Sequence, residues 1–382
     1  MTEPDTRSGA PVQSALIIGA GPAGLSAAVS LRRAGVGTVH VIEAQDRQGV
    51  TGAELSVSSP MLRALDGIGL GRRVAAAGIA IAEAQMCAPD GTVHASIPFP
   101  RVAGPDLPGT VGLGRAMLHT ILWEAAEAAG AMLWLGRRVT ELDNRPDHVT
   151  VTFSDGETSR YDLVVGADGV RSQTRVTGFP DAPVPEYTGQ IAWRARVPRR
   201  TPPMLAVFNA PDRKAGLITV TNTDSYLFLL VNAPHPGRPD QQEFPKLLRE
   251  GLAEFGGPIA DVREDITDAS LIHYSPLTSV LVPGPWYRKR VLLIGDAAHA
   301  TTPHLAYGAG LAVEDGAILG EELTGAPDVG TALDSFAERH FERCRMVVDN
   351  GLQIQRWEVE GSLDADPAGL TMRTQMAISL PA

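Results

Sequence analysis

The stretch Ser14-Ala-Leu-Ile-Ile-Gly19-Ala-Gly21-Pro-Ala-Gly24 decides the fold of the first part of this chain. Residues 14–18 are apolar after Ser14, which is typical of a short strand buried on both faces, and an Ala-rich segment that favours a helix follows the glycines. A second apolar segment, residues 39–42, ends at Glu43. A strand, a glycine turn, a helix and a strand in this order predict a βαβ unit and a Rossmann-like α/β domain.

The glycines in this turn suit a bound dinucleotide. Gly19 permits the tight turn, Gly21 has no side chain to block a pyrophosphate, and Gly24 lets helix and strand pack closely. The N–H groups at the start of the helix attract phosphates. Glu43 follows at the spacing of about 20 residues at which a carboxylate binds ribose hydroxyls, which favours FAD or NAD over NADP. This fingerprint alone does not separate FAD from NAD.

Two later segments also carry a strand into a glycine-rich turn. In the first, Asp168-Gly169 follows a strand, and Asp168 is expected to accept hydrogen bonds within the turn. In the second, the strand 291–294 presents Asp296, which is suited to a ribityl or ribose hydroxyl. A helix then starts near Gly310, and its N-terminus can stabilise negative charge on a reduced flavin.

In these three ordered motifs the sequence resembles the class A, single-component flavoprotein monooxygenases, the family of 4-hydroxybenzoate and salicylate hydroxylases. The resemblance covers nearly the whole chain. It implies FAD as cofactor and NADH or NADPH as transient electron donor. It also implies O2-dependent hydroxylation of a small aromatic or heteroaromatic substrate through a flavin C4a-hydroperoxide. No second G-x-G-x-x-G appears that would bind the nicotinamide nucleotide in a domain of its own.

The resemblance also extends to single positions. Ala53 matches the family's flavin-facing loop, Arg115 its FAD-contacting arginine, and Val139 the residue whose backbone meets the adenine. The sequence departs from the family at Glu54, where relatives often have Gly, and at residues 306–308, where they often carry Gly-Gln-Gly. The predicted cofactor-binding residues are Gly19, Gly21, Pro22, Ala23, Gly24, Glu43, Ala53, Arg115, Val139, Asp168, Asp296, Gly308, Ala309 and Gly310.

The middle of the chain predicts a different kind of structure. Residues 190–197 and 215–231 alternate between apolar and polar, as in an antiparallel sheet inserted into the α/β framework. We therefore expect an FAD-binding domain, a substrate-binding β-sheet domain, a C-terminal helical segment and a disordered N-terminal tail. Their expected ranges are, in that order, 14–75 with 104–180 and 275–330; 76–103 with 181–274; 331–382; and 1–13.

Five residues are candidates for acting on the substrate. His304 and Tyr226 are the catalytic candidates, because relatives place substrate-facing residues at these points and an imidazole can accept a proton near neutral pH. Packing is the alternative for both. Tyr307 is expected to shield the flavin or close the pocket. Lys214 and Arg194 are candidates for binding a substrate carboxylate, although charges of this kind more often lie on the surface.

Composition excludes several classes of function. The net charge of -11 argues against nucleic acid or an anionic membrane as partner. The sequence shows no signal peptide and no membrane span, and Cys87 and Cys344 form no disulfide framework, which favours the cytoplasm. His299 and His304 lack zinc-site spacing, so no metal site is expected and His299 is interpreted as structural. Glu314 and Asp315 are interpreted as acids in the first turn of a helix.

The remaining alternatives concern the reaction. A second hypothesis is a different FAD reaction on the same scaffold, such as epoxidation, halogenation or reduction. The chain lacks the lysine motif and the length of flavin halogenases. A third hypothesis is a non-catalytic flavin-binding protein, against which the intact Asp168-Gly169 segment argues. A monomer or a homodimer is expected.

Overall fold

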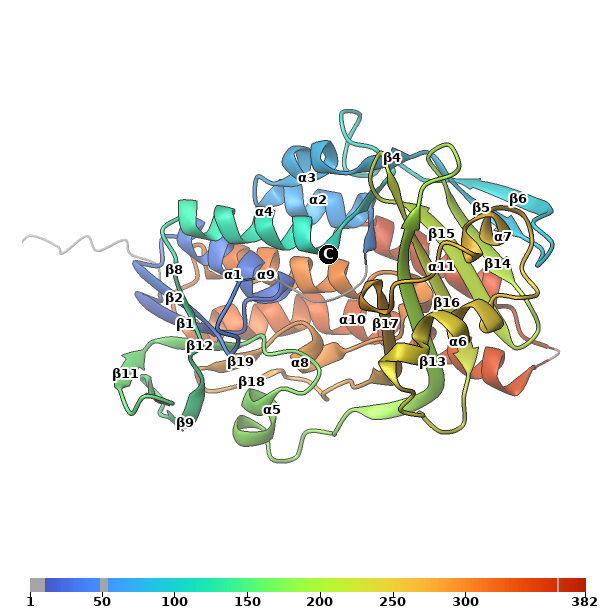
Figure 1. The fold of residues 1–382 in the computed structure, drawn as a ribbon. Coiled ribbons are helices and arrows are strands. Elements are labelled where there is room, and N and C mark those ends of the chain that lie inside the picture. Colours follow the sequence, from blue (N-terminus) through green and yellow to red (C-terminus); the bar gives the residue numbers. More distant parts are fainter. Residues whose placement is uncertain (1–10, 49–53, 363) are drawn as a thin grey trace, which may run out of the picture.

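The computed structural model describes residues 11–48, 54–362 and 364–382, and it divides into an α/β part and a β-sheet part (Figure 1). The α/β part is built on a six-stranded sheet of order β18-β19-β12-β1-β2-β8, in which every neighbouring pair except β18 and β19 is parallel. Its strands are β1 (Ser14–Ile18), β2 (Thr38–Glu43), β8 (Met132–Leu135), β12 (Leu163–Gly166), β18 (Tyr287–Arg288) and β19 (Val291–Leu293).

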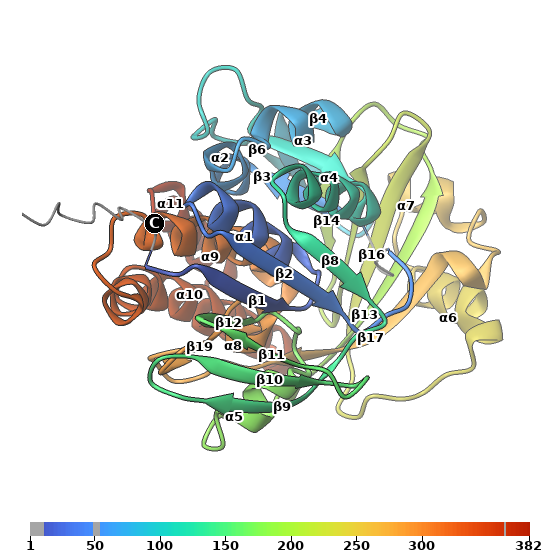
Figure 2. The ribbon, with the colours of Figure 1, turned by 90° about the vertical axis from the view of Figure 1, so that its left-hand side faces the viewer.

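Helices cover one side of this sheet, and a small antiparallel sheet lies on the other (Figures 1 and 2). The small sheet has the order β11-β10-β9. Gly316 and Gly320 bring α9 against α1, since a Cβ at either position would lie 2.4 to 2.6 Å from an α1 atom. The larger helices of this part are α1 (Pro22–Arg33), α4 (Arg115–Ala128), α9 (Gly308–Leu323) and α10 (Val329–Glu360). The strands of the small sheet are β9 (Val139–Asn144), β10 (Val149–Phe153) and β11 (Thr158–Tyr161).

The second part is a seven-stranded sheet of order β17-β13-β16-β15-β14-β5-β6. Its strands are antiparallel to their neighbours except for β14 and β5, which are parallel because the β5-β6 hairpin joins from a distant part of the chain. Strand β17 crosses the predicted domain boundary at 274/275, which stays a prediction. The strands are β5 (Glu83–Cys87), β6 (Val93–Pro98), β13 (Glu186–Pro198), β14 (Leu205–Asn209), β15 (Arg213–Thr219), β16 (Asp224–Asn232) and β17 (Ile272–Ser279).

One face of this sheet carries its own core. Apolar side chains such as Trp193, Leu227 and Phe208 pack there against helices α6 (Phe244–Gly251) and α7 (Gly257–Arg263). The other face is turned towards the α/β part and carries the polar side chains described below. The remaining elements are β3 (Leu55–Ser58), β4 (Ile79–Ile81), β7 (Thr110–Leu113), α2 (Ser59–Gly67), α3 (Gly71–Ala77), α5 (Gln173–Gly178), α8 (Asp296–His299), α11 (Pro367–Ser379), and the 3-10 helices η1 (Gln241–Glu243), η2 (Ala269–Leu271) and η3 (Pro303–Leu305).

The structure differs from the sequence-based prediction in several places. The apolar pattern of residues 61–77 predicts a single helix, but the structure divides this segment into α2 and α3, because Gly69 has a left-handed φ of 80°. Residues 12 and 13, which are expected to belong to the disordered tail, are held in the structure, since Val12 is fully buried and the Gln13 N–H donates to Asp162. Residues 1–10 lie outside the described part of the chain.

Candidate functional site

The glycine turn between β1 and α1 has the geometry that a phosphate cradle requires. Gly19 has a φ of 107°, and a Cβ at Gly24 would lie 2.0 Å from the Gly19 carbonyl oxygen, so neither position tolerates a side chain. A Cβ at Gly21, by contrast, would meet nothing within 4 Å. No side chain caps the N-terminus of α1, which begins at Pro22 and Ala23. The helix therefore presents its N-terminal dipole to open space beside Gly21.

Glu43 and Asp168 hold the turns at the ends of their strands. The Ala20 N–H donates to Glu43 at 3.2 Å, which ties the end of β2 to the glycine turn. Asp168 accepts from the Thr174 N–H at 2.9 Å and from the Ser172 hydroxyl, as expected for an acid within a tight turn. The Asp168 carboxylate is thus occupied by hydrogen bonds within its own loop. A ligand at this loop would therefore meet backbone groups and not this carboxylate.

Asp296 and Arg115 lie close together at the carboxyl end of the parallel strands. Asp296 begins α8, three residues after the end of β19, and is accessible. Protein nevertheless surrounds it closely enough that burial raises its pKa, while His299 and Arg115 act in the opposite direction. Arg115 is exposed at the first position of α4. A cation is disfavoured at a helix N-terminus, so this position favours an anionic partner near Arg115.

The N-terminus of α9 is a further uncapped helix start in this region. Gly308, Ala309 and Gly310 form its first turn, and no side chain caps it. A Cβ at Gly310 would lie 2.4 Å from the Tyr307 ring, so the glycine is required by packing. Val139 begins β9 and packs partly buried against the core. Ala53 lies outside the described residues.

Two interpretations from the sequence need correction. Tyr307 is 1 % exposed, and its hydroxyl donates to Glu314 at 2.8 Å, so its polar atom is used inside the core and the geometry does not support a role in binding substrate. Glu314 and Asp315 lie in the middle of α9, because the helix begins at Gly308. They are held by ion pairs: Glu314 with Arg343 and Asp315 with His299.

The register of the large sheet places the substrate candidates on one face. Tyr226 pairs with Arg196 across β13 and β16, Phe228 pairs with Arg194, and Leu230 pairs with Lys214 across β16 and β15. Because directly paired residues share a face and alternate residues return to it, Tyr226, Arg194 and Lys214 all lie on the face away from the α6 and α7 core.

The first end of this face, near Arg196, contains Tyr226. Tyr226 is 7 % exposed, and burial raises the pKa of its hydroxyl against the lowering effect of Arg194 and Arg115. The phenol is therefore neutral and can donate a hydrogen bond at neutral pH. Arg194 itself donates to the Ser275 hydroxyl at 2.6 Å.

The second end, near Lys214, contains His304. The His304 side chain is fully buried, and its Nε2 lies 3.1 Å from a carboxylate oxygen of Glu358 on α10. Lys214 forms an ion pair with the same carboxylate. Sequence reasoning found His304 and Lys214 but missed Glu358, which lies 144 residues from Lys214 and carries no local motif.

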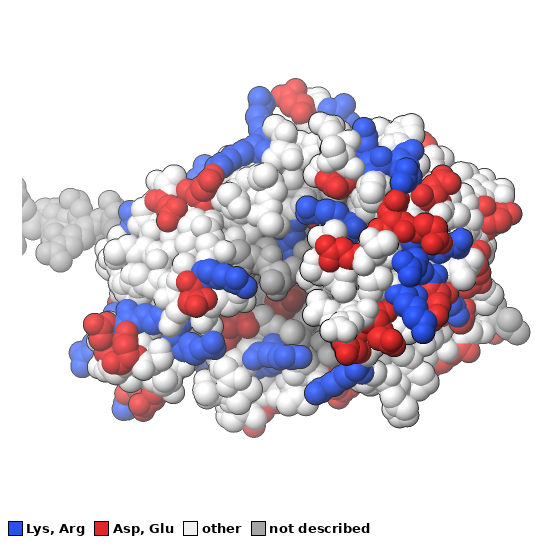
Figure 3. All heavy atoms as spheres, viewed as in Figure 1, with Lys and Arg blue, Asp and Glu red and all other residues white. Residues whose placement is uncertain are grey.

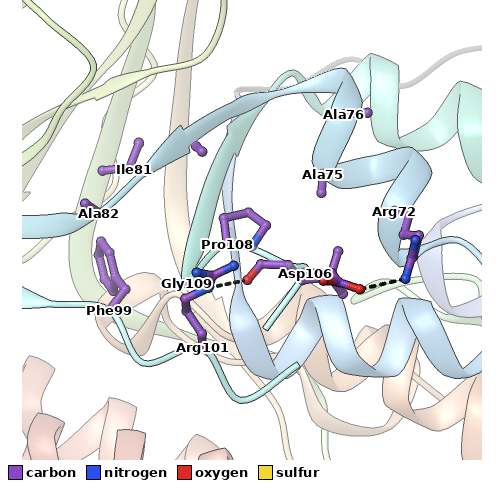
Figure 4. Close-up of a pocket in the computed structure, with 12 residues that line it drawn as sticks. Arg72, Ala75, Ala76, Ile81, Ala82, Phe99, Arg101, Asp106, Pro108 and Gly109 are labelled. Atoms are coloured by element: carbon purple, nitrogen blue, oxygen red, sulfur yellow. Dashed lines mark hydrogen bonds and ion pairs between the residues drawn. The ribbon is translucent and has the colours of Figure 1, made fainter. Parts of the chain in front are cut away.

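Between the two parts, the surface is hollowed, with Lys and Arg side chains near the edge of the hollow (Figure 3). A separate cavity of about 620 Å³ lies between α3, β4 and the loop that carries Leu107 and Gly109. Ile81 and Phe99 lie at one end of it, and the Arg72–Asp106 ion pair lies at the other (Figure 4). Ile81 and Phe99 also belong to the small apolar cluster that contains Tyr226, so this cavity borders the Tyr226 end of the face.

These features fit FAD. The open space at Gly21 suits a pyrophosphate, Glu43 suits a ribose, and the accessible Asp296 suits the ribityl chain. A scan of family models agrees: the model described as "FAD binding domain" matches residues 13–353.

The chain belongs to this FAD-binding family.

Several relatives of this chain are named as monooxygenases, hydroxylases or synthases. A 3-amino-4-hydroxybenzoate 2-monooxygenase of Streptomyces cremeus is 32% identical over 343 residues, covering 86% of this chain and 82% of the relative. A 2-heptyl-3-hydroxy-4(1H)-quinolone synthase of Pseudomonas aeruginosa is 31% identical over 322 residues, covering 83% and 82%. The chain is accordingly a flavoprotein monooxygenase that uses FAD, which confirms the expected family and cofactor.

The fold has close counterparts among solved structures. The HpxO protein of Klebsiella pneumoniae complexed with FAD and uric acid aligns with a TM-score of 0.79 at 24% identity, covering 96% of this chain and 92% of that protein. At this identity the likeness concerns the fold, which confirms the predicted FAD-binding α/β framework with an attached sheet.

The described residues also bring together a buried group that sequence spacing did not indicate. Atoms of His299, Asp315 and Cys344 all lie within 4.8 Å of one another. His299 Nε2 is hydrogen-bonded to Asp315 at 2.8 Å, a contact that fits its structural interpretation. Both Cys87 and Cys344 are free and buried. Across the described part of the chain, no helix combines the length and apolar character needed to cross a membrane.

Proposed function

We propose that this monooxygenase hydroxylates a small aromatic or heteroaromatic substrate whose ring carries an acidic O–H or N–H group. The observation that carries the proposal is the face of the large sheet that lies away from α6 and α7. Tyr226, Arg194 and Lys214 share this face, and Glu358 joins Lys214 to His304 at the end of the face opposite Tyr226. The substrate named for one relative, an aminohydroxybenzoate, and the ligand bound in one structural neighbour, uric acid, are compounds of this kind.

When bound, FAD accepts a hydride from NADH or NADPH and activates O2. The protein contributes by positioning the substrate against the cofactor and by excluding water. Tyr226 can donate a hydrogen bond to an oxygen of the substrate ring. Arg194 lies two residues from the Tyr226 row, about 7 Å along the strands, and can balance a negative charge that develops on the ring. His304 can accept the substrate proton, which makes the ring more electron-rich.

The test is a panel of phenols, N-heteroaromatics and larger polyketide-like aromatics, added to the FAD-loaded protein with NADH or NADPH. We expect one class to stimulate oxidation of the nucleotide and to yield a product heavier by one oxygen atom. A product of a different mass would favour another FAD reaction, such as epoxidation of an alkene, halogenation or reduction. No reduction of the bound flavin by either nucleotide, with every substrate present, would favour the non-catalytic alternative.

Two further properties belong to this proposal. We propose that the protein works in the cytoplasm, which the two free, buried cysteines support. We also propose that it works as a monomer or a homodimer, without nucleic acid and without a metal ion. Sedimentation of the FAD-loaded protein gives its mass directly, and a trimer or larger assembly would contradict this proposal.

A further inference from the structure

The carboxylate of Glu358 is a meeting point of three chain segments. Its Oε2 lies 3.1 Å from His304 Nε2 on η3 and 3.3 Å from Gln190 Nε2 on β13, and its Oε1 pairs with Lys214 on β15. The backbone is held as well, because the Asn232 side chain donates to the Glu358 carbonyl at 2.9 Å. The end of α10 is thereby anchored on the face of the large sheet that carries Gln190, Lys214 and Asn232.

The charges of this group determine where the His304 proton lies. Burial disfavours the carboxylate, but His304 and Lys214 together lower the pKa of Glu358 to about 2. Glu358 is therefore ionised at neutral pH and can only accept hydrogen bonds. Since Nε2 faces this carboxylate, Nε2 must carry the proton and donate it.

The other ring nitrogen is then left as a base. Burial lowers the pKa of His304, and Lys214 adds to this effect while Glu358 opposes it, so the imidazole is neutral at neutral pH. In the neutral ring with a proton on Nε2, Nδ1 carries a lone pair. Nδ1 is buried and has no hydrogen-bond partner among the described residues. A buried polar atom without a partner is costly, and at functional sites it is often reserved for a ligand.

We infer that Glu358 and Lys214 position His304 so that its Nδ1 accepts the acidic proton of the substrate. This inference rests on the proposed function, because it requires a substrate with an ionisable O–H or N–H group. In the step, the O–H or N–H bond of the substrate breaks and an N–H bond forms at Nδ1, while the electron pair stays on the substrate atom. The resulting imidazolium lies between the substrate anion and the Glu358 carboxylate.

Glu358 and Lys214 have distinct roles towards His304. Glu358 fixes the tautomer and stabilises the imidazolium, as a carboxylate does for a neighbouring histidine in other proton-transfer sites. Lys214 acts in the opposite direction, since its positive charge disfavours the imidazolium and keeps His304 unprotonated before substrate binds. Glu358 and Lys214 are therefore positioning residues, and only His304 contacts the reacting proton.

The first test uses NMR of the FAD-loaded protein with 15N-labelled histidine, and the resonances of His304 are assigned with H304N. We expect a neutral ring protonated at Nε2 at pH 7. K214M should raise the His304 pKa and E358Q should lower it, each by about one unit or more. E360Q is the matched control, because Glu360 is exposed two residues further along the same helix and should leave the His304 titration unchanged.

The second test follows the enzyme. The acidic limb of the kcat/KM profile for the best substrate of the panel should move to higher pH in K214M and to lower pH in E358Q. E358D keeps a carboxylate at this position, so its kcat/KM should lie between those of E358Q and the wild type. A ring protonated at Nδ1, or shifts of the same sign in both variants, would overturn the inference. Circular dichroism of each variant confirms that it is folded.

The two tests separate this inference from the proposed function. If the NMR titrations behave as expected but no aromatic substrate is hydroxylated, the positioning group stands and the proposed function fails. If hydroxylation occurs but its pH profile is the same in both variants as in the wild type, the inference fails and the proposed function stands.

Discussion

Glu54 and Arg196 form an ion pair between the start of β3 and the seven-stranded sheet, with Arg196 Nε 2.9 Å from the Glu54 carboxylate. Glu54 is buried, whereas Arg196 is about half exposed. The pair connects the FAD-binding part, directly after the position of Ala53, with the strand that faces Tyr226. The Glu54 carboxylate balances positive charge at the Tyr226 end of the face, where Arg196 pairs with it and Arg194 and Arg115 act on the Tyr226 hydroxyl.

Replacing Glu54 by Gln should therefore affect cofactor binding more than folding. We expect E54Q to lower the free energy of unfolding by at most about 1 kcal/mol, because Arg196 is partly solvated. The dissociation constant for FAD should rise several-fold, as measured by the quenching of flavin fluorescence. Asp106→Asn, which breaks the exposed Arg72–Asp106 pair, is the control and should leave FAD affinity unchanged. A loss of stability with unchanged FAD affinity would contradict the connecting role.

The glycine turn allows a cleaner separation of binding from folding. A Cβ at Gly21 meets open space, so G21A should fold with the melting temperature of the wild-type apoprotein but bind FAD more weakly by about tenfold or more, since the methyl group occupies the pyrophosphate position. G24A places its Cβ 2.0 Å from a backbone oxygen and should lose both stability and FAD. Thermal unfolding of the two apoproteins distinguishes them, and equal destabilisation would refute this division.

The ionised side chain of Asp296 should destabilise the apoprotein near neutral pH. Burial raises its pKa above the unfolded value, so the folded state binds this proton more tightly and loses stability as pH rises through the raised pKa. The neutral variant D296N should make the apoprotein more stable than wild type at pH 7.5, and the gain should shrink as pH falls towards 4. FAD should raise the melting temperature of the wild type more than that of D296N. Equal stabilisation by FAD would argue against Asp296 as a cofactor ligand.

The sequence predicts the FAD-binding part well because its information is local. In residues 14–43, the turn, the helix start and the acid lie within one βαβ unit, and each is specified by the steric needs of a few neighbouring atoms. The break at Gly69 was missed because the apolar pattern continues through it, although a glycine with positive φ ends one helix and allows the next to start.

The sheet face and its partners depend on register and on long-range contacts. Alternation shows that Tyr226 and Phe228 share a face, but only the pairing of β13, β15 and β16 shows that Arg194 and Lys214 share it too. No sequence pattern predicts the contacts of Glu358 and Cys344, because α10 brings these residues to their partners from the far end of the chain. Sequence reasoning also placed Asp315 at a helix start because the true start, Gly308, has no capping side chain to mark it.

The last prediction concerns the buried group around Asp315. Burial alone would raise the pKa of Asp315, but His299 and His340 lower it well below its usual range, and the Gly295 N–H adds a hydrogen bond at 2.6 Å. The same pairing raises the pKa of His299 despite its burial. The stability that His299 contributes is therefore fully present below its unfolded pKa of about 6.5 and is lost as pH rises through its raised folded pKa.

The variant H299Q should test this sign. At pH 6 it should lower the free energy of unfolding by about 3 kcal/mol, because Asp315 loses its buried charged partner. By pH 9 the difference from wild type should be clearly smaller, since the wild-type histidine has begun to lose its proton. Urea unfolding at both pH values gives this comparison, and H148Q, at a partly exposed histidine on the β9–β10 turn, is the control. If the His299–Asp315 ion pair alone accounts for this stability, dialysis against a chelator should leave the wild-type curve unchanged. A loss of stability on dialysis would instead reveal a metal held by His299, Asp315 and Cys344.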